Sequence, residues 1–254
     1  MTFVTVSPEG TTTAIRINRP PLNIINLEMM NELARALETA SQSDQTAVVV
    51  LRSGVEGVFS AGADVREHLP DRADELIRTF EALVRQLLTY PMPTVSVVQG
   101  KCLGGGMELA LACDFVLATK GAVFGQPEVK VGVFPPAALA LLPRMVGPRT
   151  AHDILLTGRT VPAEEAAGLG LVTRVVDEDG LESALNRLSG MLSEHSRVVM
   201  ELIKRGVREC GSLPLEEALR RSSDLYLQEL MRTEDALEGL NAFLEKRKPE
   251  WKNR

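Results

Sequence analysis

Runs rich in β-branched residues alternate with helical patterns along much of the chain. Residues 47–51, 94–98 and 115–118 form three such short runs, as is typical of strands buried on both faces of a sheet. Apolar residues with a helical period separate the runs at 74–88 and 107–112. Because strands that alternate with helices need crossover connections, the sequence predicts a layered α/β domain.

The N-terminal segment has a different pattern. Residues 3–6 and 14–17 each alternate between apolar and polar side chains, and Pro8-Glu9-Gly10 lies between them. This arrangement predicts a hairpin-like pair of strands. Apolar residues over 29–37 then recur with the period of an amphipathic helix.

The C-terminal third is expected to be mainly helical. A last strand is predicted at 171–176, and helical patterns then cover 181–192, 198–208 and 215–244. No linker rich in glycine, serine or proline divides the chain. We therefore expect a core over residues 1–190, followed by a helical region over residues 191–254.

Composition limits the possible partners. The 254 residues carry a formal charge of −6, which argues against the basic surface that nucleic acid binding requires. Cys102, Cys113 and Cys210 lie far apart, so neither a disulfide framework nor a zinc site is expected. The sequence shows no secretory signal and no apolar run long enough to cross a membrane. A cytoplasmic location is expected.

Two stretches of small residues could let the backbone approach a ligand. Residues 59–65 follow the strand at 47–51, and the glycine-rich residues 100–109 open a helix. The first N–H groups of a helix are unsatisfied and lie at the positive end of its dipole, so they can stabilise developing negative charge. Neither of the common glycine patterns of phosphate-binding loops is present here. A purely structural turn remains the alternative.

Two glutamates accompany these stretches. Glu108 lies in the first turn of the helix opened by the glycines, and Glu128 follows a Gly-Gln-Pro turn. Two carboxyl groups brought to one pocket from different elements can act as general acid and general base. Most of the 34 acidic residues must be surface charges, so the placement of these two is what makes them candidates.

Other nucleophile candidates lack the expected neighbours. His68, His152 and His195 have no carboxylate or cysteine at a recognisable spacing. Ser60 does not lie in a Gly-x-Ser-x-Gly motif. We expect none of the four to act as a nucleophile or as its base.

The motifs, taken in order, resemble the enoyl-CoA hydratase/isomerase (crotonase) superfamily. The resemblance rests on Ala61-Gly62-Ala63-Asp64, on Gly104-Gly105-Gly106-Met107-Glu108 and on Phe124-Gly125-Gln126-Pro127-Glu128. Further segments along nearly the whole chain also resemble this family, namely 19–23, 156–159, 163–166, 170–172 and 242–247. The resemblance implies an α/β crotonase-like spiral of ββα units, followed by a helical C-terminal trimerisation region and assembly as a homotrimer or homohexamer.

The resemblance also implies the roles of individual residues. The backbone N–H groups of Ala63 and Gly105 would form an oxyanion hole for the thioester carbonyl, and Glu108 and Glu128 match the two hydratase glutamates. Positions that match substrate or CoA contacts are Pro21, Leu22, Ala61, Asp64, Val65, Arg66 and Pro136. The implied substrate is an acyl-CoA thioester, with no metal and no cofactor beyond the CoA of the substrate itself. Keeping both glutamates favours water addition.

One segment departs from the family pattern. In the pattern that the resemblance implies, common hydratases have a glycine at the position of Pro136. Proline has no N–H to donate to a reacting water. Residues 134–137 are Phe-Pro-Pro-Ala, which looks more like the branch that hydrates cyclic dienoyl-CoA thioesters. The alternatives are a superfamily isomerase or lyase, and a non-catalytic acyl-CoA-binding member.

Overall fold

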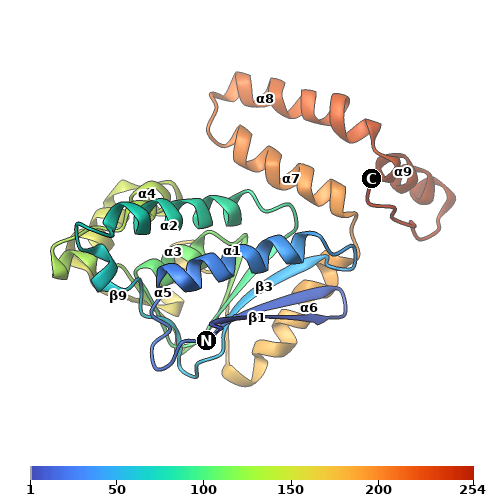
Figure 1. Cartoon of the computed structure of the whole chain (residues 1–254). Coiled ribbons are helices and arrows are strands. Elements are labelled where there is room, and N and C mark those ends of the chain that lie inside the picture. Colours follow the sequence, from blue (N-terminus) through green and yellow to red (C-terminus); the bar gives the residue numbers. More distant parts are fainter. Residues whose placement is uncertain (1) are drawn as a thin grey trace.

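The computed structural model describes residues 2–254, and its central element is a six-stranded sheet (Figure 1). In spatial order the strands are β1 (Val4–Glu9), β2 (Thr12–Ile17), β3 (Val48–Ser53), β5 (Thr94–Val98), β7 (Phe115–Thr119) and β10 (Arg174–Val176). Strands β1 and β2 pair antiparallel, as the predicted hairpin requires, and the other neighbours pair parallel. The predicted α/β layering is confirmed.

Helices pack on both faces of this sheet. The helices of the core are α1 (Leu27–Ser41), α2 (Ala73–Leu88), α3 (Gly105–Leu111), α4 (Pro136–Thr157), α5 (Ala163–Gly168) and α6 (Leu181–Ser193). On β3, Val49 and Leu51 pack into the core shared with α1 and α2, whereas Val48 and Val50 pack with Leu181 of α6. Figure 1 shows α1 and α2 on one side of the sheet and α6 on the other. Burial on both faces explains why the sequence of this strand is continuously apolar.

Short strands within residues 2–254 form a second, four-stranded sheet. In order they are β4 (Val58–Ser60), β6 (Lys101–Leu103), β8 (Val123–Gly125) and β9 (Thr160–Pro162). Strands β4, β6 and β8 run parallel and follow β3, β5 and β7 in the chain, and a helix comes after each of them. The ββα unit therefore recurs along the core. The sequence does not predict these strands, because three residues are too few to show alternation.

Helix α4 is also absent from the sequence predictions. Proline stands at its first position and twice within it, at Pro143 and Pro148, and the helix kinks at Gly147, whose φ is 74°. Prolines normally end a helical pattern, but here Pro148 begins the second segment after the kink, where its missing N–H costs little. The strand expected at 171–176 is confined to β10, because Leu171 and Val172 are buried in the core without joining the sheet.

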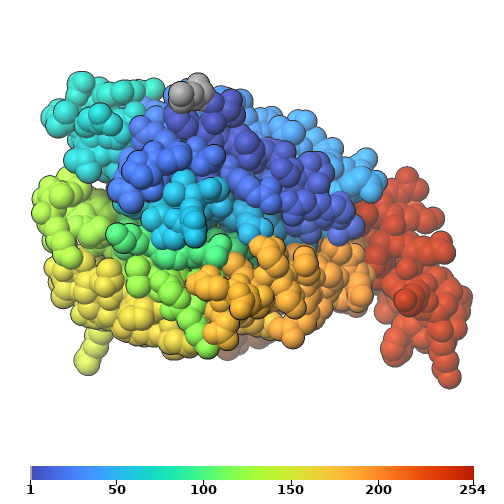
Figure 2. Space-filling model, turned by 90° about the horizontal axis from the view of Figure 1, so that it is seen from below, coloured from blue at the N-terminus to red at the C-terminus, as the bar shows by residue number. Residues whose placement is uncertain are grey.

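The C-terminal helices project away from the core. They are α7 (Arg197–Cys210), α8 (Leu215–Asp224) and α9 (Glu234–Glu245). Figure 2 shows the end of the chain as a protrusion beside the compact body. The helix expected over 215–244 is interrupted, and Thr233 caps α9 by accepting a 3.1 Å hydrogen bond from the N–H of Ala236. No helix within residues 2–254 has both the length and the apolar character needed to span a bilayer.

Candidate active site

The second sheet brings the three predicted motifs to one place. The loops that follow β4, β6 and β8 leave the same edge, because these strands are parallel neighbours. The Gly104 N–H donates a 2.9 Å hydrogen bond to the Gly125 carbonyl. A Cβ on Gly62 would lie 3.4 Å from the Leu103 carbonyl oxygen. Segments far apart in sequence thus meet in one groove.

Two residues that line this groove, Ala63 and Gly105, have backbone N–H groups free to donate. Ala63 forms a parallel bridge with Ile25, in which the Ile25 N–H bonds to the Gly62 carbonyl and the Asp64 N–H bonds to the Ile25 carbonyl. This pattern turns the N–H of Ala63 away from Ile25. Gly105 is the first residue of α3, where N–H groups have no helical acceptor. Within residues 2–254 neither amide has a hydrogen-bond acceptor.

The two amides are close neighbours. A Cβ added to Gly105 would lie 3.5 Å from the Ala63 nitrogen. Gly104, which directly precedes Gly105, adopts φ 52° and ψ −132°, a conformation that residues with side chains rarely adopt. A Cβ on Gly104 would also overlap Oε1 of Glu128. Glycine is therefore required at position 104 on both backbone and steric grounds.

Glu108 is buried, with 3% of its surface exposed. The Ala138 N–H, near the start of α4, donates a 2.6 Å hydrogen bond to its Oε1. The pKa of Glu108 is raised to about 7, mainly because the carboxyl group is buried; the hydrogen bond from Ala138 lowers the pKa, and the nearby charge of Glu128 raises it. Such a carboxyl group can hold or release a proton near neutral pH.

Glu128 lies in a short 3-10 helix, Pro127–Val131, with its carboxyl group against Gly104. Burial raises the pKa of Glu128 as well. Its Oε2 is buried and has no hydrogen-bond partner within residues 2–254. An unpartnered buried carboxyl oxygen is costly unless another molecule satisfies it. Both glutamates line a small cavity of about 20 Å³.

Three cavities adjoin along the groove. An outer cavity of about 420 Å³ is lined by five of the predicted substrate residues, Pro21, Leu22, Asp64, Val65 and Arg66. A middle cavity of about 240 Å³ shares Val65 with it and includes Ala61 and Glu128. The small inner cavity includes Gly105, Glu108 and Pro136. Ala63 lines all three cavities, so the predicted site residues face one continuous path.

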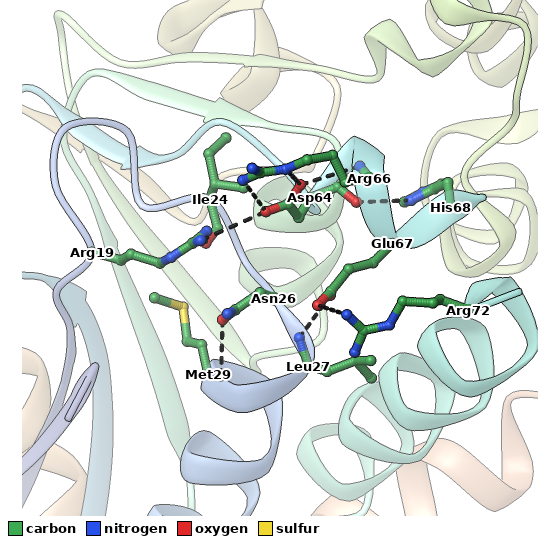
Figure 3. A network of polar contacts seen from close by, with 10 residues as sticks. All are labelled: Arg19, Ile24, Asn26, Leu27, Met29, Asp64, Arg66, Glu67, His68 and Arg72. Carbon is green, nitrogen blue, oxygen red and sulfur yellow. Dashed lines mark hydrogen bonds and ion pairs between the residues drawn. The ribbon is translucent and has the colours of Figure 1, made fainter. Parts of the chain in front are cut away.

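A polar network holds the loop that carries Ala63 (Figure 3). The Arg66 side chain donates two 3.2 Å hydrogen bonds to the carboxylate of Asp64, and this lowers the pKa of Asp64. Arg19 lies 3.6 Å from the same carboxylate. The buried Glu67 accepts a 2.8 Å hydrogen bond from the N–H of Leu27, at the start of α1. The network thus fixes the loop to α1.

Several lining residues were not predicted as site residues. These are Leu76, Ile77 and Phe80 of α2, which line the inner cavity; Phe134 and Pro135, from the segment that departs from the family pattern, also line it. The residues from α2 have the same sequence pattern as core residues, so periodicity gives no sign that they also reach a cavity.

His68 and Ser60 both lie near the groove and interact with its backbone. His68 also lines the inner and middle cavities, and its Nδ1 lies 3.3 Å from the Asp64 carbonyl oxygen. Ser60 donates to the Asn23 carbonyl and accepts from the Gly62 N–H, so its hydroxyl stabilises the loop. Within residues 2–254 no group of three His, Cys, Asp or Glu side chains has an arrangement that could hold a metal ion.

The chain matches known proteins over almost its whole length. The family model of enoyl-CoA hydratase/isomerase matches residues 8–254. A cyclohexa-1,5-dienecarbonyl-CoA hydratase of Thauera aromatica is 39% identical over 248 residues, which cover 97% of this chain and 95% of that protein. A probable enoyl-CoA hydratase of Rhizobium meliloti is 39% identical over 253 residues, covering 98% and 97%.

A solved structure shows the same fold. The crystal structure of an enoyl-CoA hydratase from Bacillus anthracis superposes with a TM-score of 0.93 at 29% identity, covering 99% of this chain and all of that one. The expected crotonase-like fold is therefore confirmed. With the family model spanning the groove and its motifs, the chain belongs to the enoyl-CoA hydratase/isomerase family and is an enzyme.

Proposed function

We propose that the chain reversibly adds water across the double bond of an α,β-unsaturated acyl-CoA thioester. The observation that carries this proposal is that the buried Glu108 and the half-buried Glu128, whose Oε2 is buried, line one small cavity beside two backbone N–H groups that have no acceptor within residues 2–254. Family membership supports hydratase chemistry in general terms.

The two N–H groups suit the thioester carbonyl. Attack of water at the β-carbon moves negative charge onto the carbonyl oxygen, and in this proposal the neighbouring N–H groups of Ala63 and Gly105 donate to it. One such donor typically stabilises the transition state by about 3 kcal/mol. Both donors belong to backbone fixed by strand pairing and by a helix start, so they need little reorganisation during the reaction.

The two carboxyl groups suit the proton transfers. Because the pKa of each is raised, one can stay protonated near neutral pH while the other is ionised. The ionised group takes a proton from water as the C–O bond forms at the β-carbon. The protonated group then supplies a proton to the α-carbon, and the double bond becomes a single bond. A cavity of about 20 Å³ has room for one water molecule.

The outer cavity suits the CoA portion of the substrate. Arg19 and Arg66 line it together with the apolar Pro21, Leu22 and Val65. The Arg66 side chain is 83% exposed, so its remaining donors can meet a phosphate. No metal or further cofactor is part of this proposal.

The acyl group proposed for this chain is a compact one, including a cyclic dienoyl group. This finer assignment is supported by the 39% identity to the cyclohexa-1,5-dienecarbonyl-CoA hydratase. It is also supported by Phe134, Pro135 and Pro136, which line the inner cavity with bulky, stiff side chains.

A superfamily isomerase or lyase would use the same N–H groups, and a non-catalytic member would bind the thioester without turnover. The purified protein should therefore be incubated with crotonyl-CoA and with cyclohexa-1,5-diene-1-carbonyl-CoA, with loss of the conjugated thioester absorbance followed over time and the products identified by mass. Hydrated product from either thioester supports the proposal. Rearranged product, or no product despite binding, contradicts it.

The helical region over 191–254 is proposed to assemble the chain as a homotrimer or homohexamer. Its helices expose large apolar side chains, which are Ile203, Val207, Leu215, Leu219, Leu227, Leu237, Leu240, Phe243 and Leu244. Exposed apolar surface of this kind marks an interaction surface. Light scattering on the purified protein tests this assembly, since a monomer would contradict it.

A cytoplasmic location of the protein also stays a prediction.

A further inference from the structure

A second apolar cavity lies behind the inner cavity of the groove. It has a volume of about 360 Å³ and is formed between α2 and α4. Its lining includes Val84, Leu88, Ala137, Ala140 and Leu141. Its size and apolar character are those of a small-molecule site, but nothing in the proposed reaction uses it. We call it the rear cavity.

Three residues separate the rear cavity from the inner one. Ile77, Phe80 and Pro136 line both cavities, so their side chains form a partition between them. Two of them come from α2 and the third is the first residue of α4. The partition therefore lies where these two helices meet beside the carboxyl groups.

Phe80 is the largest member of the partition and lies closest to the proposed oxyanion hole. Its ring atom Cζ would lie 3.3 Å from a Cβ placed on Gly105, and the residue is only 7% exposed. The ring therefore fills the space between the Gly105 backbone and the rear cavity. Pro136 is held by its ring and by the helix start, so it cannot easily move aside.

We propose that Phe80 is a specificity-determining residue, which ends the acyl site at the partition and keeps linear acyl tails out of the rear cavity. This inference rests on the proposed function, since it places the thioester beside Ala63 and Gly105 and directs the acyl group from the middle cavity toward the inner one. The substrate class is then short or compact acyl thioesters. Removal of the Phe80 ring joins the two cavities, and a longer tail gains an apolar surface to bury.

The test compares the binding of two saturated thioesters, decanoyl-CoA and butyryl-CoA, by isothermal titration calorimetry. The variants are Phe80→Ala and Ile77→Ala in the partition, with Val84→Ala as the matched control. Val84 also lies on α2 and lines the rear cavity but not the inner one. Its truncation enlarges the rear cavity and leaves the partition in place.

Phe80→Ala is expected to raise the affinity for decanoyl-CoA relative to butyryl-CoA by about tenfold or more, since several methylene groups become buried. Val84→Ala should change that ratio by less than about threefold. A ratio in Phe80→Ala no larger than in Val84→Ala would overturn the proposal. If Phe80→Ala fails to fold, Ile77→Ala decides in the same way.

Saturated thioesters cannot be hydrated, so this readout does not depend on turnover. Failure of the wild-type protein to hydrate any enoyl-CoA would contradict the proposed function. The ratio of affinities for decanoyl-CoA and butyryl-CoA would still test the role of Phe80. Unchanged ratios in an active hydratase would contradict the partition alone.

Discussion

The backbone N–H of Ala138 donates a 2.6 Å hydrogen bond to Oε1 of Glu108. This bond joins the start of α4 to α3, and it satisfies one of the N–H groups that a helix start leaves free. Pro136 occupies the first position of α4, where the absence of an N–H costs least. The N–H that binds the carboxyl group therefore belongs to the residue two positions after the proline. Through this bond Glu108, which lies on α3, is fixed to the start of α4.

The raised pKa of Glu108 makes stability depend on pH. Its value of about 7 in the folded protein exceeds the ordinary 4.5, so the contribution of this group is fully present below pH 4.5 and is lost as pH rises to about 7. We expect the free energy of unfolding of Glu108→Gln to rise relative to wild type by roughly 3 kcal/mol over this range. Urea titrations at several pH values measure the difference. A difference that does not change with pH contradicts this account of Glu108.

Gly104→Ala should reduce kcat/KM by about 100-fold or more, because the new Cβ overlaps Glu128 and φ is 52°. Gly168→Ala is the matched control, since a Cβ on Gly168 meets no atom within 4 Å. The control should remain within about threefold of wild type. Steady-state kinetics on both variants measure this, and equal effects at the two glycines would show that crowding of Glu128 is not the cause.

Gly105→Pro should abolish measurable turnover, because proline removes the N–H proposed for the thioester oxygen. Proline is tolerated at the first position of a helix, so α3 should still form. Gly105→Ala is the comparison, since it adds a Cβ that lies 3.3 Å from the Phe80 ring but keeps the N–H. Far-ultraviolet circular dichroism checks folding. Normal turnover by a folded Gly105→Pro protein would exclude this N–H from the reaction.

Selectivity among substrates tests the assignment of the acyl group. We expect kcat/KM for cyclohexa-1,5-diene-1-carbonyl-CoA to exceed that for crotonyl-CoA by about tenfold, or about 1.4 kcal/mol of transition-state binding. The reason is that Phe134, Pro135 and Pro136 line the reacting end of the groove. Both thioesters should be measured in the same buffer. A preference for crotonyl-CoA would end the cyclic assignment.

The sequence predicts the central sheet well, because β3, β5 and β7 are buried on both faces and therefore carry continuous apolar or β-branched runs. It does not predict the second sheet or α4. Strands of three residues carry no period, and the prolines of α4 resemble breaks although one of them begins a helical segment. The second sheet and α4 both depend on tertiary contacts, which the local sequence pattern does not show.

Part of the candidate site can likewise be predicted from the sequence and part cannot. Glu108, Glu128 and the glycines at 104–106 can be found from sequence, since carboxyl groups beside a glycine-rich helix start indicate acid–base chemistry. Phe80 and Ile77 cannot, because a residue on the buried face of α2 has the same pattern whether it packs in the core or lines a cavity. Whether such a residue packs in the core or lines a cavity is decided by the contact between α2 and α4, which only the structure shows.

The proposed hydration requires both Glu108 and Glu128, so the turnover of their glutamine variants is the decisive measurement. Each substitution keeps the shape of the side chain and an oxygen acceptor but removes the titrating proton. With the better of the two thioesters, kcat of Glu108→Gln and of Glu128→Gln should each fall by about 100-fold or more, while the Kd for a saturated acyl-CoA stays within about threefold. Turnover within about threefold of wild type in either variant would contradict the account.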